Sequence, residues 1–399
     1  MGQPRLIVVP LTILHVSQPV DGGVAQIVAD LLRGQIADGH RVVLACPVGG
    51  GAGESRLVAA ARAVGAEVRP WAATRGAVPS LRREVAPLRR IVAGTDPHLV
   101  HLHSSKAGLA GRLAVRGTRP TVFQPHAWSF AAVTGATAAL ARGWERWAAR
   151  WTDRLLCVSA QEQRDGEAAG VRGSWALVPN GLDLDRFDPS RLPEQEQARA
   201  LLDLDDDGPW AVCVGRLCRQ KGQDLLLRAW AGVPARVPGA RLALVGEGPD
   251  RSVLEAFASR LAHPDSVLFA GQSEDPRDWY AAGDLTVLSS RWEGMALAPL
   301  EAMACARPVL LTEVAGAREC LPPEWGPPVP VEDVAALREA LVARLSDREG
   351  CRRDGLRARA RVVERHDLRD TRSRVSEVYE EILNGRHDRD RREDMTIAY

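Results

Sequence analysis

Lysine is almost absent from this 399-residue chain: 50 of its 52 basic residues are arginine, and only Lys106 and Lys221 are lysine. Since arginine serves wherever any cation suffices, these two positions are candidates for a compact point charge with rotating donors. A large net charge is also missing, because 51 acidic residues bring the total to +1. This balance excludes a nucleic-acid binder held by bulk charge.

Paired cysteine motifs and long apolar runs are missing too. The seven cysteines are scattered without Cys-x-x-Cys spacing, and no apolar run reaches the roughly 18 residues of a membrane-spanning helix. The apolar run Leu6–Leu14 is broken by Pro10 and lacks a small-residue cleavage site, so no signal peptide is expected. The sequence therefore predicts a cytoplasmic protein with reduced, buried cysteines.

Charge is distributed unevenly between the two halves. Residues 1–185 carry 21 basic and 14 acidic side chains, a net charge of +7, which leaves −6 for the remainder. A basic front half suggests an anionic partner such as a phosphate-bearing lipid or a membrane surface. The alternative is a chance imbalance of surface charge.

Short apolar strand-like runs alternate with helical patterns along most of the chain, and this occurs twice. The pattern predicts two doubly wound α/β domains. The expected strands are Thr12–Ser17, Arg41–Cys46, Leu99–His103, Thr121–Gln124, Leu155–Val158, Ala176–Val178, Ala211–Val214, Arg241–Val245, Val267–Phe269, Leu285–Leu288 and Pro308–Thr312. The expected helices include Val24–Asp38, Pro79–Ala93, Lys106–Val115, Gln223–Val233, Arg251–Leu261, Pro299–Cys305 and Thr371–Leu383.

The polar, proline-containing stretch 188–208 marks the boundary between the two domains. We expect a first domain over 1–183, a second over 184–365, a C-terminal helix over 366–385 and a charged, disordered tail over 386–399. The triplet Asp205-Asp206-Asp207 lies in the connecting stretch, and we interpret it as solvated rather than metal-binding.

Two cations follow the first strand of the second domain, in Gly215-Arg216-Leu217-Cys218-Arg219-Gln220-Lys221-Gly222. Arg216 and Lys221 would stand beside a helix N-terminus, where they could bind a diphosphate and stabilise its charge as it leaves. The pattern is not that of a P-loop. The alternative is a pair of solvated surface cations.

Two carboxylates stand eight residues apart in the segment 290–303. Glu293 lies in a loop after a strand, and Glu301 lies near the start of a helix that Pro299 helps to define. Glu301 could hold vicinal hydroxyls such as those of a ribose, Glu293 could hold hydroxyls of a sugar, and the amides of 295–297 could face an anion. The alternative is a loop acid plus a helix acid favoured by the dipole.

The front half offers glycines and a second lysine at strand ends. Gly22 and Gly23 open a helix and allow close approach of a ligand, although a plain strand–helix turn also uses glycine. The helix start Ser104-Ser105-Lys106 could bind an acceptor phosphate, the alternative being a capped helix. His101 and His103 could suggest a metal, but no third ligand is evident in the sequence, and no metal site is expected.

Together these motifs resemble the retaining glycosyltransferases of the GT-B fold, family 4, and in particular those that build exopolysaccharide and capsule. The ordered matches are Gly22-Gly23, His126 in Pro125–Phe130, Val178–Asp183 with Phe187, Val214–Arg216 with Lys221-Gly222, Val245–Pro249, Ala282–Asp284, Glu293 through Ala304, Pro308-Val309, and Gly316 with Glu319. After the first Glu-Gly the family often has an aromatic and then a small residue, whereas Met295 and Ala296 follow here.

The resemblance implies two Rossmann-like domains that face a cleft, a UDP- or GDP-linked sugar donor, no metal, and a C-terminal helix that crosses back to the first domain. It implies roles for single residues as well. Arg216, Lys221, Glu293 and His126 would be the catalytic group, and Ser104, Ser105 and Lys106 would meet the acceptor. The donor would be bound by Gly22, Gly23, Gly215, Arg216, Lys221, Glu293, Gly294, Met295, Ala296, Leu297 and Glu301.

The implied activity is retaining transfer of a hexose-type sugar to a lipid-linked or membrane-proximal acceptor. The alternatives are a soluble small-molecule acceptor for the same donor chemistry, and a sugar-nucleotide epimerase. Segment 138–151 bears on the choice between a membrane-proximal and a soluble acceptor. In it, Trp144, Trp147 and Trp151 share one helical face and three arginines share another. We expect these tryptophans to fill a core face; the alternative is peripheral contact with the cytoplasmic side of an anionic membrane.

Overall fold

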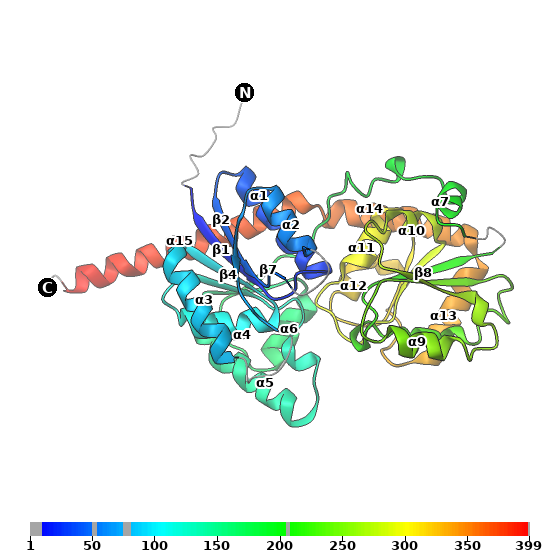
Figure 1. The fold of residues 1–399 in the computed structure, drawn as a ribbon, viewed down its shortest axis with the longest axis horizontal. Coiled ribbons are helices and arrows are strands. Elements are labelled where there is room, and N and C mark those ends of the chain that lie inside the picture. Colours follow the sequence, from blue (N-terminus) through cyan, green and yellow to red (C-terminus); the bar gives the residue numbers. More distant parts are fainter. Residues whose placement is uncertain (1–9, 50–53, 75–80, 205–207, 398–399) are drawn as a thin grey trace. The chain divides into compact units, whose positions relative to one another are not determined.

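The computed structural model describes residues 10–49, 54–74, 81–204 and 208–397 (Figure 1). The chain divides into two compact units: unit 1 comprises Met1–Val178 and Arg372–Tyr399, and unit 2 comprises Pro179–Thr371. The triplet 205–207 and residues 1–9 lie outside the described residues. All seven cysteines are buried and unpaired, as the sequence predicts.

Unit 1 is built on a parallel seven-stranded sheet of order β3-β2-β1-β4-β5-β6-β7. Its strands are β1 (Thr12–Ser17), β2 (Arg41–Cys46), β3 (Glu67–Pro70), β4 (Leu99–His103), β5 (Thr121–Gln124), β6 (Arg154–Cys157) and β7 (Trp175–Leu177). Its α-helices are α1 (Gly23–Ala37), α2 (Arg56–Ala63), α3 (Leu81–Thr95), α4 (Ser104–Val115), α5 (Gly135–Ala148), α6 (Ala160–Ala168) and the part of α15 (Leu368–Ile397) that follows residue 371.

Alternation along the strands separates two helical layers on the two faces of this sheet (Figure 1). Leu14, Val16 and Leu102 join the core with α3 and α4. Val42 and Leu44 join a second core with α1 and α2. The residues that alternate with these apolar side chains along β1 and β4 include three histidines. His15, His101 and His103 are all fully buried.

Unit 2 is built on a parallel five-stranded sheet of order β10-β9-β8-β11-β12. Its strands are β8 (Trp210–Val214), β9 (Arg241–Val245), β10 (Val267–Gly271), β11 (Leu285–Leu288) and β12 (Val309–Leu311). Its α-helices are α7 (Gln195–Leu201), α8 (Gln223–Trp230), α9 (Arg251–Ala258), α10 (Arg277–Ala282), α11 (Leu297–Ala304), α12 (Ala317–Cys320), α13 (Val334–Ser346) and α14 (Arg348–Arg365).

The C-terminal helix is longer than the sequence suggests. It runs from Leu368 to Ile397, whereas we expected a helix that ends at residue 385 and a disordered tail over 386–399. Residues 386–399 contain neither proline nor glycine, so no residue of this segment is a strong helix breaker. Arg372 Nε donates to the Asp30 carbonyl (3.0 Å) and Arg386 Nη2 to Asp153 (2.7 Å), which attaches this helix to unit 1.

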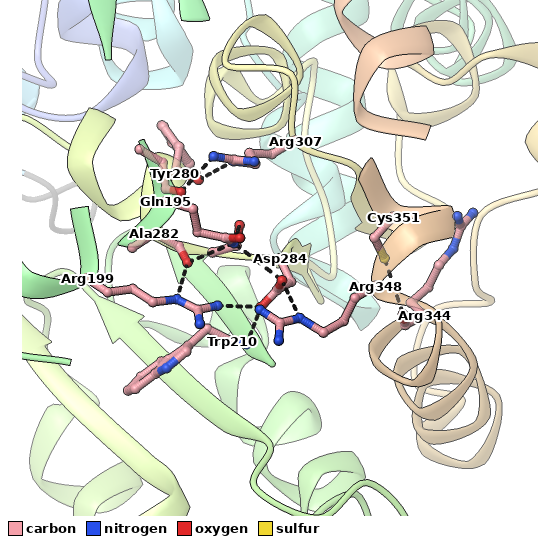
Figure 2. Close-up of polar contacts among 12 residues, drawn as sticks. Gln195, Arg199, Trp210, Tyr280, Ala282, Asp284, Arg307, Arg344, Arg348 and Cys351 are labelled. Atoms are coloured by element: carbon pink, nitrogen blue, oxygen red, sulfur yellow. Dashed lines mark hydrogen bonds and ion pairs between the residues drawn. The ribbon is translucent and has the colours of Figure 1, made fainter. Parts of the chain in front are cut away.

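Asp284, in the Ala-Gly-Asp motif before β11, is a structural anchor (Figure 2). Its carboxylate accepts hydrogen bonds from Arg199 (2.7 Å), from the Trp210 amide (2.8 Å) and from Arg348 (3.1 Å). Asp284 and Arg199 are both almost fully buried. One carboxylate thus joins α7, β8 and α14 at the amino end of β11.

Candidate functional site

The carboxyl ends of β8 and β11 lie side by side in unit 2. The chain leaves β8 toward β9 and returns on the other side through β11, which makes this pair the point where the strand order reverses. Ligands of such sheets bind beyond the strand ends at this point. The loop after β8 carries Arg216 and Lys221, and the loop after β11 carries Glu293.

Lys221 and Glu293 form an ion pair across these two loops. Lys221 Nζ lies 2.6 Å from Glu293 Oε1, and Ser290 Oγ donates to the same oxygen at 2.8 Å. Gln220 Nε2 donates to the other carboxylate oxygen at 3.4 Å. The carboxylate is therefore held in one orientation, and its charge is balanced by the lysine.

Arg216 differs from the other cations nearby. Its side chain is exposed and makes no hydrogen bond or ion pair with any described residue. Arg291, by contrast, is held by Asp224 through two contacts of 2.7 Å and by Glu332, and these bonds raise its pKa. Arg291 therefore braces the loop, whereas Arg216 is available to an anion.

Gly222 lets the two loops approach closely. Its φ is +64°, and a Cβ there would lie 2.1 Å from the carbonyl oxygen of Ser289, so only glycine fits without displacement. Ser289 Oγ donates to the Gly222 carbonyl at 2.8 Å. The glycine that follows Lys221 thus fixes where that lysine stands relative to Glu293.

Glu301 lies on α11 and is held by a residue that the sequence analysis missed. Tyr280 donates its hydroxyl to Glu301 Oε2 at 2.7 Å. Burial and the neighbouring carboxylate raise the pKa of Tyr280 well above 10, so it remains a hydrogen-bond donor. No motif in the sequence marks this role, because Tyr280 stands in the short helix α10 among residues without a recognisable functional pattern.

The segment 294–297 that leads into α11 is fixed from two sides. Buried Asn180 donates to the Met295 carbonyl at 2.8 Å, which assigns a structural role to the Pro-Asn-Gly motif. Gly316 approaches Gly294 so closely that a Cβ would lie 2.7 Å from its carbonyl oxygen. Ala296 is the N-cap residue of α11, and Leu297 is its first residue.

In unit 1 the corresponding reversal of strand order lies between β1 and β4. Gly22 and Gly23 begin α1 after β1, both exposed, and Gly22 has a φ of +78° with open space where a Cβ would stand. Ser104 and Ser105 begin α4 after β4. These residues belong to unit 1, whereas the other predicted donor-binding residues belong to unit 2.

Lys106 is engaged within unit 1. Its Nζ lies 3.1 Å from Glu84 Oε2, and the Glu84 side chain is 1% exposed while that of Lys106 is 11% exposed. The predicted role of Lys106 in binding an acceptor phosphate stays a prediction, and its charge is already balanced by this carboxylate.

His126 follows β5 in a strained turn, with φ values of +55° at His126 and +122° at Ala127. Glu162 stabilises this backbone: its two carboxylate oxygens accept hydrogen bonds from the Ala127 amide (2.7 Å) and the Val158 amide (2.8 Å). Burial lowers the pKa of His126 to about 3, so the ring is neutral. Its Nε2 lies 3.2 Å from His103 Nδ1.

His15 is the histidine that the sequence analysis did not associate with His101 and His103. One ring nitrogen of each of the three lies within 4.8 Å of the others. They converge because His15 and His101 are register partners in β1 and β4, and His103 follows two residues later on the same face. The sequence signal that could have found this group is that both predicted strands, Thr12–Ser17 and Leu99–His103, contain a histidine near the middle.

Helix α5 does not place its tryptophans in the core. The residues that it buries are Ala138, Glu145 and Ala148. Trp147 is 42% exposed and Leu140 is 75% exposed, while Trp144 and Trp151 are half-buried and contact Trp147. The expectation of a tryptophan-filled core face is therefore wrong, because the residues that α5 buries are two alanines and a glutamate rather than its tryptophans.

Two family sequence models match the chain. "Glycosyltransferase Family 4" matches residues 21–186, and "Glycosyl transferases group 1" matches residues 208–347. No helix among the described residues combines the length and apolarity needed to cross a membrane.

Two curated relatives and one solved structure illustrate the similarity. The lipopolysaccharide core biosynthesis mannosyltransferase LpsB of Rhizobium meliloti is 30% identical over 249 residues, which cover 60% of this chain and 69% of LpsB. A GDP-mannose-dependent monoacylated α-(1-6)-phosphatidylinositol monomannoside mannosyltransferase of Corynebacterium glutamicum is 33% identical over 205 residues, 49% of this chain and 53% of that protein. Anabaena HepE, solved with UDP and glucose, shares the fold with a TM-score of 0.79 at 20% identity, over 93% of this chain and all of HepE.

Proposed function

Because the chain belongs to the family 4 glycosyltransferases and has their GT-B fold, we propose that it transfers a hexose-type sugar from a UDP- or GDP-linked donor, with retention of anomeric configuration and without a metal. The observation that carries this proposal is the group at the carboxyl ends of β8 and β11. Arg216, which has no side-chain partner among the described residues, stands in the same loop as Lys221, and Lys221 pairs with Glu293 of the neighbouring loop.

The contacts of unit 2 support the assignment of different residues to different parts of the donor. Arg216 and Lys221 bind the diphosphate, Glu301 binds the ribose hydroxyls with Tyr280 fixing its orientation, and Glu293 binds hydroxyls of the transferred sugar. Since Lys221 already neutralises Glu293, the net positive charge left for the diphosphate comes from Arg216.

The proposed reaction is substitution on one face of the sugar ring. The bond between the anomeric carbon and the phosphate oxygen breaks, and the acceptor oxygen forms the new bond to that carbon. The acceptor proton passes to the leaving phosphate oxygen, so no protein base is needed. The protein contributes charge stabilisation and orientation, and Arg216 and Lys221 stabilise the charge of the leaving diphosphate.

Lipid-linked acceptors are favoured by the relatives and by unit 1. The relative from Corynebacterium acts on a phosphatidylinositol monomannoside, and LpsB acts in lipopolysaccharide core biosynthesis. On α5, the exposed stripe of Leu140 and Trp147 is flanked by Arg150, whose guanidinium lies 4.7 Å from the Trp147 ring centroid. Tryptophan beside arginine is suited to the interface of an anionic membrane.

The donor is tested by calorimetric titration with UDP, GDP and ADP, first without metal and then with Mg²⁺. We expect one diphosphate to bind without metal, which would also identify the nucleobase. Arg216→Ala should abolish this binding and lower turnover by about 10²-fold or more. Arg219→Ala is the matched control, because Arg219 stands in the same loop and lies over the Trp292 ring instead. Equal effects of both substitutions, or no binding by the folded wild-type protein, would refute the assignment.

Membrane contact is tested by sedimentation with vesicles that contain anionic lipid. We expect Trp147→Ser combined with Arg142→Ala and Arg150→Ala to abolish binding. The control replaces Arg82 and Arg83 with alanine, which removes two exposed arginines from α3 of the same unit. Unchanged sedimentation of the α5 variant would favour the soluble-acceptor alternative.

A further inference from the structure

A chain of buried hydrogen bonds connects the C-terminal helix to His126 through the interior of unit 1. It runs from Tyr379 on α15 to Gln35 on α1, then to His15 on β1, His103 on β4 and His126 after β5. Tyr379, Gln35, His15 and His103 are buried. No feature of the proposed donor chemistry requires these groups, apart from His126 itself.

The hydroxyl of Tyr379 sets the direction of the chain. It lies 2.6 Å from His101 Nδ1, a short distance that fits donation of the phenolic proton to an imidazole nitrogen. With its proton committed to His101, the hydroxyl oxygen can only accept from Gln35, whose Nε2 lies 3.4 Å away. The Gln35 amide is thereby oriented with its carbonyl oxygen toward His15.

Each following contact then has one possible donor. Gln35 Oε1 lies 2.8 Å from His15 Nε2 and must accept the proton of that nitrogen. His15 Nδ1 is therefore an acceptor, and it lies 2.9 Å from His103 Nε2, which donates. His103 Nδ1 is in turn an acceptor and lies 3.2 Å from His126 Nε2, which donates.

Neutral rings make this ordering strict, because a neutral imidazole has one donor and one acceptor nitrogen. Burial lowers the pKa of His15 to about 4 and that of His126 to about 3, and it lowers the pKa of His103 well below 6.5. No ring in the chain is therefore an imidazolium at neutral pH, and fixing one nitrogen fixes the next.

We propose that Tyr379, Gln35, His15 and His103 are positioning residues that hold His126 as the Nε2–H tautomer, with Nδ1 presented as a hydrogen-bond acceptor. Nδ1 of His126 makes no hydrogen bond with any described residue. The partner that fits it is a hydroxyl donor. This inference rests on the proposed function for the identity of that donor, a hydroxyl of the transferred sugar, but the tautomer itself is independent of any substrate.

A metal ion is the competing use of the same histidines, since nitrogens of His15, His101 and His103 lie within 4.8 Å of one another. His15 Nδ1 and His103 Nε2, however, lie at a hydrogen-bonding distance of 2.9 Å. Binding a metal through these two nitrogens would break that hydrogen bond, and the tautomer of His126 would then no longer be set by His15.

The test is long-range ¹H–¹⁵N NMR of the full-length protein labelled with ¹⁵N-histidine, in which the two tautomers and the imidazolium give distinct nitrogen shifts. The His126 signals are assigned by their loss in His126→Gln. We expect a protonated Nε2 and an unprotonated Nδ1 at His126, unchanged after dialysis against EDTA. A protonated Nδ1, an imidazolium, or shifts that change on metal removal or on addition of Zn²⁺ would overturn the proposal.

Tyr379→Phe then tests the origin of the order, because it removes one hydroxyl and leaves the ring. We expect both tautomers of His126 to appear. The matched control is Thr95→Val, which removes a buried hydroxyl of α3 that donates to the Ile91 carbonyl at 2.8 Å. This hydroxyl takes no part in the hydrogen bonds that connect Tyr379 to His126. A single unchanged tautomer in folded Tyr379→Phe would refute the role of Tyr379. If this variant does not fold, Gln35→Met interrupts the chain one step later and gives the same expectation.

The functional consequence is measured with the nucleotide sugar whose diphosphate binds in calorimetry. We expect Tyr379→Phe to lower kcat by about tenfold, the scale of one lost hydrogen bond, without changing the Kd of the diphosphate. A fall in diphosphate affinity of the same size would instead indicate general damage to the fold. Absence of any diphosphate binding by the wild type would refute the proposed function while leaving the tautomer result intact.

Discussion

Replacement of Asp284 by asparagine should destabilise unit 2 severely without altering its ligand site. The substitution keeps the size of the side chain but removes the charge that balances Arg199 and Arg348. The side chains of Asp284 and Arg199 are 4% and 2% exposed, so Arg199 would be left as a buried cation without its carboxylate (Figure 2).

The magnitude follows from that burial. Breaking one partner of a buried ion pair costs about 3–5 kcal/mol, because the remaining charge keeps its desolvation penalty. For a unit of this size each kcal/mol corresponds to about 2–4 °C, so we expect the Tm of unit 2 to fall by about 6–20 °C. The exposed pair Arg236–Glu339 is the contrast: because solvent screens both charges, Glu339→Gln should leave the Tm almost unchanged.

Thermal unfolding followed by circular dichroism measures both variants. Calorimetric titration with the diphosphate, well below the Tm of Asp284→Asn, should give the wild-type affinity, since Asp284 precedes β11 and the ligand site follows it. A Tm loss below about 2 °C would refute the reasoning about burial. A normal Tm with weakened binding would show that Asp284 acts on the ligand instead.

Three further results are expected. Gly222→Ala should weaken diphosphate binding by about tenfold in calorimetry, because its Cβ would meet the Ser289 carbonyl at 2.1 Å, whereas Gly94→Ala on α3 has open space and should bind normally. Tyr280→Phe should weaken binding by about three- to tenfold through loss of the Glu301 hydrogen bond, and wild-type affinity would contradict that role. Acid should destabilise unit 1, because burial lowers the pKa of His15 from 6.5 to about 4. Below pH 6.5 the unfolded state therefore binds a proton at this histidine, whereas the folded state does not until the pH approaches 4. Stability that is intact above pH 6.5 should fall by about 3 kcal/mol for this histidine as the pH approaches 4, and urea unfolding curves that coincide at pH 7.5 and 5 would exclude the effect.

The sequence was sufficient for most of the architecture because the parallel strands are buried on both faces. Runs such as Arg41–Cys46 and Arg241–Val245 have no competing periodicity, and their predicted bounds agree with β2 and β9. The edge strand β3 was missed because Glu67–Pro70 is half polar and half exposed. The end of α15 was missed because a highly charged segment resembles a solvated tail in composition.

The candidate site was predictable where residues cluster along the chain and hidden where they meet through the fold. Arg216, Lys221 and Glu293 lie in two loops with glycines and charges beside them. Tyr280 reaches Glu301 from α10, and neither its position in the sequence nor the residues beside it predict that contact. The two lysines also differ: Lys221 joins the two loops, whereas Lys106 meets Glu84, a residue 22 positions earlier that belongs to another helix.

Unit 1 is discontinuous in sequence, since residues from 372 onward complete it after the whole of unit 2 has been synthesised. Tyr379 arrives with that last segment and contacts both His101 and Gln35. During translation, therefore, β1, β4 and α1 emerge early, but His101 Nδ1 and Gln35 Nε2 can meet the Tyr379 hydroxyl only after the C-terminal helix has been synthesised. If Tyr379 orders the histidines as proposed, a chain truncated before Tyr379 would have the strands of unit 1 without the hydroxyl that sets the direction of their hydrogen bonds.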